Sequence, residues 1–196
     1  MSLKLGALAA MRFLPLSSIL VLTLTSTVLP AAEFRKPVEI TGSGGSVPSP
    51  DGRLELFWSR SDPNGPHEIW VRSSQKPTEQ TLVHTFSRSA SVLWSPNGAL
   101  IAITDRQTSD ETRVRVFRVL PALVVQEMKD AARYIDKAFF LGKDGAPIYG
   151  HSYAGAVRWS KDSDSLEVEI RAYDALDGSQ RKLQKRVWVK FPPLIK

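Results

Sequence analysis

The stretch "VLWSPNGALIAITDR" (residues 92–106) decides the fold of this chain. Its proline presets φ, and Asn97 followed by Gly98 supplies positive φ at little cost, so the chain turns sharply here. "ALIAIT" (99–104) then carries apolar side chains on both faces, which is typical of a central strand. The stretch therefore predicts a strand, a tight turn and a buried strand in succession.

Two further stretches repeat this pattern, "SVPSPDGRLELFWSR" (46–60) and "VRWSKDSDSLEVEIR" (157–171). Ser49, Ser95 and Ser160 occupy the same place in the three stretches. In the first two, a second strand follows at a similar distance, "HEIWVRS" (67–73) and "RVRVFRV" (113–119). Ser49 and Ser95 are 46 residues apart, and Ser95 and Ser160 are 65 apart. A period in the forties with several strands in each unit is typical of β-propeller blades.

The repeat resembles that of TolB-like β-propeller proteins. "WSPNG" (94–98) matches the family motif, "SPDG" (49–52) lacks the leading tryptophan, and "WSKDS" (159–163) lacks both proline and glycine. The resemblance spans residues 46–119 and, more loosely, 156–191. It implies a scaffold that binds partners, and it carries over no catalytic residue.

Three arrangements of these units stay open, because closed propellers have about four to eight blades and this chain has room for about three. The units could form an open stack of sheets, a half-propeller completed by a second copy, or a β-sandwich with repeat-like hairpins.

Apolar residues alternate one by one with mostly polar ones in residues 166–171 and 187–191. This pattern indicates antiparallel strands with one solvent-exposed face. One segment, "QEMKDAARYIDKAFF" (126–140), instead spaces its apolar residues by four, three and four, which predicts a helix. We expect this helix to cover an edge or end of a sheet. The predicted fold class is all-β, with antiparallel sheets in blade-like, partly propeller-like units and one short helix inserted.

The amino terminus has the features of a signal peptide over residues 1–32. A basic start precedes an apolar run at 13–29, and the small residues Ala31 and Ala32 follow. An uncleaved anchor is the alternative. Residues 33–48 predict a flexible linker, because "TGSGGSVPSP" (41–50) combines glycine, serine and proline without an apolar face, and residues 49–196 predict the β domain.

Export would place the protein in the periplasm or outside the cell, with no membrane span in the mature form. The chain has no cysteine, which excludes a disulfide framework and a thiol-linked lipid anchor. The formal net charge is +6, with basic residues crowded in "RKLQKRVWVK" (181–190). We interpret this run as a solvated strand face and expect no nucleic-acid partner.

"GHSYAG" (150–155) is close to the nucleophile turn of serine hydrolases, with Ser152 as the candidate. Its last glycine falls one place late, and no histidine follows His151, whereas the triad of that fold runs serine, acid, histidine. We therefore predict that Ser152 is not catalytic and that the segment is a loop into a strand at 156–159. A hydrolase remains the second alternative function.

The binding candidates are Trp58, Trp70 and Trp188, which lie in predicted strands. Trp70 and Trp188 alternate with neighbours that should face the core, and an exposed aromatic face would mark a sugar or protein site. A second buried sheet face is the alternative. The three histidines lack metal-ligand spacing, and Asp162 and Asp164 begin a calcium loop that does not continue, so no metal or cofactor is predicted.

The sequence thus predicts an exported, non-enzymatic scaffold for binding or assembly. We expect a protein partner or self-association, with residues 53–58 as an unprotected strand edge. The alternative is a carbohydrate-binding β-sandwich that uses the tryptophan face.

Overall fold

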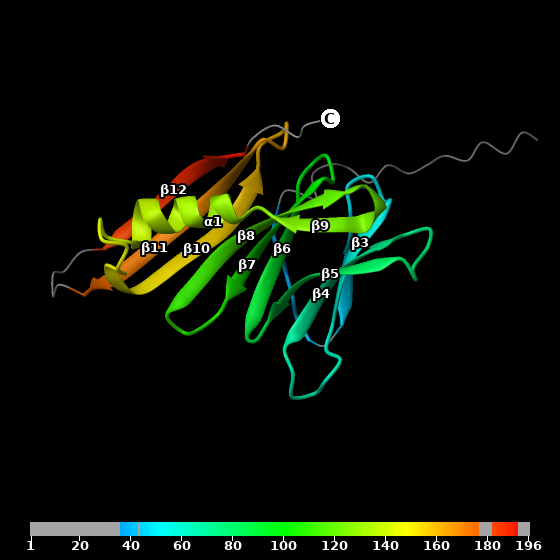
Figure 1. The fold of residues 1–196 in the computed structure, drawn as a ribbon, viewed down its shortest axis with the longest axis horizontal. Helices are drawn as coiled ribbons and strands as arrows, with labels where there is room; N and C mark the ends of the chain where they lie inside the picture. Colours follow the sequence, from blue (N-terminus) through cyan, green and yellow to red (C-terminus); the bar gives the residue numbers. More distant parts are fainter. Residues whose placement is uncertain (1–35, 43, 177–181, 192–196) are drawn as a thin grey trace, which may run out of the picture.

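The computed structural model describes residues 36–42, 44–176 and 182–191 (Figure 1). The predicted signal peptide, residues 1–32, lies outside these ranges. The predicted all-β class with one short helix is confirmed. The first sheet contains four antiparallel strands in chain order: β2 (Gly45–Pro48), β3 (Leu54–Ser59), β4 (His67–Ser73) and β5 (Gln80–Phe86).

The second sheet has eight strands, in the order β1-β6-β7-β8-β10-β11-β12, with β9 paired to β8. Their bounds are β1 (Val38–Glu39), β6 (Ser89–Trp94), β7 (Leu100–Arg106), β8 (Glu111–Leu120), β9 (Val124–Glu127), β10 (Tyr149–Trp159), β11 (Ser165–Ala175) and β12 (Leu183–Lys190). All pairs are antiparallel except β8 with β10, which meet in a short parallel contact at Ser152 and Tyr153.

Three units follow from this topology: β2–β5 is the first unit, β6–β9 the second and β10–β12 the third. The same turn opens each unit. The backbone N–H of Ser49 donates to the carbonyl of Leu54 at 2.8 Å, and the Ser49 hydroxyl accepts from the Leu54 N–H at 2.9 Å. Ser95 with Leu100, and Ser160 with Ser165, make the same two bonds.

Two tryptophans join the units in register. Trp94 Nε1 donates to the carbonyl of Val47 at 3.3 Å, and Trp159 Nε1 donates to the carbonyl of Leu93 at 3.2 Å. Both tryptophans precede a repeat serine by one residue, and both acceptors precede the repeat serine of the previous unit by two. Since both indoles are buried, these bonds fix how each unit stacks on the next.

The second unit is buried on both of its faces. One face packs against the first unit in a core that includes Leu56, Ile69, Val71, Val92, Ile101 and Ile103. The other face packs against the third unit in a second core that includes Leu100, Ala102, Val116, Val168 and Ile170. This explains the apolar run at 99–104, and the prediction that it forms a central strand is confirmed because β7 lies between β6 and β8.

The expected linker at 33–48 is corrected where the structure describes it, because β1 and β2 lie inside it. Val38 pairs with Val92 in the second sheet, and Gly45 pairs with Trp58 in the first. A Cβ at Gly45 would overlap the ring of Trp58, so this glycine leaves room for an indole.

The helix is α1 (Lys129–Ile135), which continues as a π-helical turn, η3 (Asp136–Phe140). A 3₁₀ turn, η2 (Pro121–Leu123), precedes β9. The predicted start at 126 is wrong, because 126 and 127 belong to β9. In the π turn, the Leu141 N–H donates to the carbonyl of Asp136, and the extra residue brings Phe140 into the core beside Ile135.

The helix covers the core-facing side of the third unit and β8, so the expected position at a sheet edge or end is corrected (Figure 1). Within the described residues, no helix is long and apolar enough to cross a membrane.

Candidate functional site

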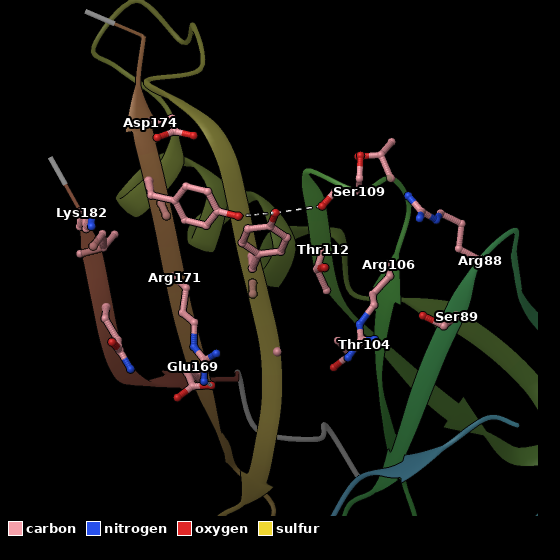
Figure 2. Close-up of a pocket in the computed structure, with 18 residues that line it drawn as sticks. Arg88, Ser89, Thr104, Arg106, Ser109, Thr112, Glu169, Arg171, Asp174 and Lys182 are labelled. Atoms are coloured by element: carbon pink, nitrogen blue, oxygen red, sulfur yellow. Dashed lines mark hydrogen bonds and ion pairs between the residues drawn. The ribbon is translucent and has the colours of Figure 1, made fainter. Parts of the chain in front are cut away.

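An open hollow of about 950 Å³ lies between the second and third units (Figure 2). Residues that line it lie on the β5–β6 loop, the end of β7, the β7–β8 loop, β10, β11 and the start of β12. The repeat turn of the second unit joins the end of β6 to the start of β7. The hollow lies at the other end of these two strands. Loops held by a rigid scaffold are the usual place for binding groups.

Four cationic side chains line the hollow: Arg88, Arg106, Arg171 and Lys182. Two acids, Glu169 and Asp174, also line it, and both are already paired. Arg171 Nη2 lies 2.6 Å from Glu169 Oε2, and Asp174 Oδ2 lies 3.2 Å from His151 Nε2. Among the described residues, Arg88 and Arg106 form no ion pair, so the hollow carries an excess of positive charge.

Two tyrosines form the wall of the hollow on β10 and β11. The Tyr153 hydroxyl donates to the carbonyl of Ser109 at 2.9 Å and lies 3.2 Å from the Tyr173 hydroxyl. The hydrogen bond with Tyr173, followed by burial, raises the pKa of Tyr153 to about 12. Its hydroxyl therefore stays protonated at neutral pH, and it holds the β7–β8 loop against β10.

His151 extends this wall. Its ring stacks on Tyr173 with 4.5 Å between centroids, and its Nδ1 lies 3.1 Å from Asp110 Oδ1 on the β7–β8 loop. Asp174 lies at the other ring nitrogen. The imidazole therefore bridges a loop of the second unit and a strand of the third.

Ser152 lies inside β10, so the prediction that "GHSYAG" is a loop is wrong. The Ser152 hydroxyl accepts from Arg113 Nη1 at 3.0 Å, and the Ser152 N–H donates to the carbonyl of Asp110. A serine nucleophile needs a sharp strand-to-helix turn and a base beside its hydroxyl. Here the hydroxyl faces a guanidinium on an extended strand.

The three candidate tryptophans do not share a face. Trp58 is 6% exposed and belongs to the first core, so its place in an exposed site is corrected. Trp70 is half-buried on the opposite face of the same sheet, where its ring stacks on Phe57 at 6.4 Å. Trp188 is 49% exposed, on β12 of the other sheet. The tryptophan face of a carbohydrate-binding sandwich is therefore not formed.

The expected open edge at residues 53–58 is also corrected. This segment overlaps β3, which pairs with β2 on one side and β4 on the other. Leu56, in the middle of this segment, is 0% exposed and belongs to the first core.

Within the described residues, no group of three His, Cys, Asp or Glu side chains is placed to hold a metal ion. A scan against protein-family models finds no match, and no curated protein matches the chain. The side chains of the hollow were missed by sequence reasoning because they come from separate elements and share no spacing. The tyrosines and arginines of the hollow follow no local sequence pattern.

Proposed function

We propose that this chain is an exported, non-enzymatic binding scaffold built of TolB-like β-propeller repeats. The repeat turn with its two serine hydrogen bonds supports the repeat, and the tryptophan bonds between units support a rigid stack. Export rests on the basic, apolar and small-residue order of residues 1–32.

The observation that carries the binding role is the hollow between the second and third units. Its polar and charged side chains come from several strands and loops of a framework that fixes their positions. A hollow of this size, with several convergent polar groups, suits a small ligand or the end of a larger one.

The binding role is tested by screening the mature protein against immobilised glycans and peptides. We expect a ligand that the wild-type protein retains and the Arg106→Glu variant loses, because Arg106 lines the hollow. Arg133→Glu, on the exposed side of α1, makes the same charge change outside the hollow and should keep the ligand. Equal binding by all three proteins would place the site elsewhere, and the absence of any ligand would contradict the scaffold function.

Export is tested separately by mass spectrometry of the protein recovered outside the cytoplasm. The expected amino terminus is Ala32 or Glu33. A full-length species retained in the membrane would show that the segment is an anchor.

A further inference from the structure

We infer that the hollow binds an oxyanion, a carboxylate or phosphate group of the ligand, through Arg88 and Arg106. This inference rests on the proposed binding function and names the chemical class of the ligand.

The pairing of β6 with β7 brings the backbones of these two arginines to the same end of the sheet. Ser89 is the register partner of Arg106, so Arg88 lies one residue from the position directly opposite Arg106. Both side chains are exposed and line the hollow. Figure 2 shows Arg106 extending from β7 toward β10, and Arg88 reaching toward the loop that carries Ser109.

Two cations that line one hollow without a counter-ion repel one another. The two acids of the hollow face other partners, because Glu169 pairs with Arg171 and the Asp174 carboxylate faces His151. A bound oxyanion would balance the charge. Guanidinium groups also match carboxylates and phosphates in geometry, since each offers parallel N–H donors.

Threonine hydroxyls complete the donor set on the same hollow. Thr108 Oγ1 accepts from the Asp110 N–H at 3.1 Å, and Thr104 Oγ1 accepts from the Ala156 N–H at 3.0 Å. A hydroxyl that accepts one bond from the backbone keeps its own hydrogen for donation. Both threonines can therefore donate to an anion beside the arginines.

The test is a calorimetric titration of the mature protein at low ionic strength with three probes: inorganic phosphate, an oligogalacturonate and a neutral galactose oligomer. We expect saturable binding of phosphate, of oligogalacturonate or of both, and their comparison identifies the anionic group. Arg88→Gln and Arg106→Gln should each weaken it by about tenfold or more, because a charge-assisted hydrogen bond is lost. Added salt should weaken it as well.

Arg133→Gln is the matched control and should bind as the wild type does. Failure of both anionic probes to bind, or equal loss in Arg133→Gln, would overturn the inference. Equal binding of the neutral oligomer would also overturn it, but would leave the proposed binding function standing.

Discussion

At the residue scale, Ser163 shows how the third unit keeps the repeat turn without glycine. Gly52 and Gly98 have φ of 69° in the first two turns, and Ser163 takes the equivalent place with φ of 64°. A side chain in this left-handed region costs about 1–2 kcal/mol. The Ser163 hydroxyl offsets part of this cost, because it accepts a hydrogen bond from the Asn97 N–H at 3.1 Å and links the second turn to the third.

This balance predicts the order of stability of two variants. Ser163→Ala keeps the strained backbone and loses the bond to Asn97, whereas Ser163→Gly loses the same bond but relieves the strain. We expect the alanine variant to be less stable than the glycine variant by about 0.5–1 kcal/mol, after allowing for the greater entropy of glycine in the unfolded chain. Urea unfolding measures the difference, and equal stabilities would contradict the strain argument.

We expect the Tyr153 hydroxyl to lose its proton at a higher pH than an ordinary tyrosine, as a late step in an alkaline titration. The pKa of Tyr153 is about 12, mainly because of its hydrogen bond with Tyr173, so Tyr173→Phe should return it toward the ordinary 10.0. Since the folded pKa is the higher one, the stability that this bond contributes is present below pH 10 and is lost as the pH rises toward 12. Phenolate absorbance during an alkaline titration measures the shift.

Tyr134→Phe is the control for this titration. Tyr134 is an exposed residue on α1, so its removal should delete one tyrosine signal and leave the late titration in place. Loss of the late step in Tyr134→Phe, or its persistence in Tyr173→Phe, would show that the pair does not cause it.

At the scale of the element, α1 joins the second core through a small set of side chains. Ala131, Ile135 and Phe140 are buried, and Met128 and Phe139 pack at the margin. The π turn of η3 sets which phenylalanine enters, since a regular α-helix would rotate Phe140 away from the position it holds.

The helix should be anchored chiefly by Ile135, which is 2% exposed. Ile135→Ala leaves a cavity in the second core and should lower the free energy of unfolding by about 2–5 kcal/mol. Lys137→Ala, on the exposed side of η3, should change it by about 0.5 kcal/mol or less. Chemical denaturation compares the two, and a small effect of Ile135→Ala would show that the helix adds little to the core.

At the scale of the whole molecule, a side-chain hydrogen bond crosses from the first sheet to the second. His84 Nε2 on β5 lies 2.9 Å from Asp105 Oδ2 on β7, and both side chains lie in the interior between the sheets. The histidine ring also packs against Phe117 at 5.9 Å between centroids. The contact therefore ties the first unit to the second beside their shared apolar core.

Removal of one partner should be costly, because it leaves the other polar group buried alone. We expect His84→Ala to lower the free energy of unfolding by about 1–3 kcal/mol. The double variant His84→Leu with Asp105→Leu should recover most of this, since apolar replacement of both partners is often neutral. Thermal or urea unfolding of the wild type, the single variant and the double variant measures these differences. A double variant no more stable than His84→Ala would contradict the pairing argument.

The features that the sequence determined by itself are local ones. The turn at Ser95 follows from a hydroxyl, a proline and an Asx-Gly pair within a few residues, so it can be predicted without knowledge of the rest of the chain. The same holds for the alternating strands and for the presence of one helix, which the apolar spacing predicts. The residues that the helix buries, Ala131, Ile135 and Phe140, depart from that spacing, and the longer step to Phe140 arises because η3 is a π turn.

Features that depend on a distant partner arise only when the chain is folded. Val38 forms a strand because it meets Val92, and "GHSYAG" is extended because β11 and β8 flank it. Trp58 is buried because the second unit covers it, while the hollow exists because Arg88, Arg106 and Tyr173 come from separate elements. Backbone pairing and burial are long-range interactions. The periodicity of a short segment does not determine which distant surface packs against it.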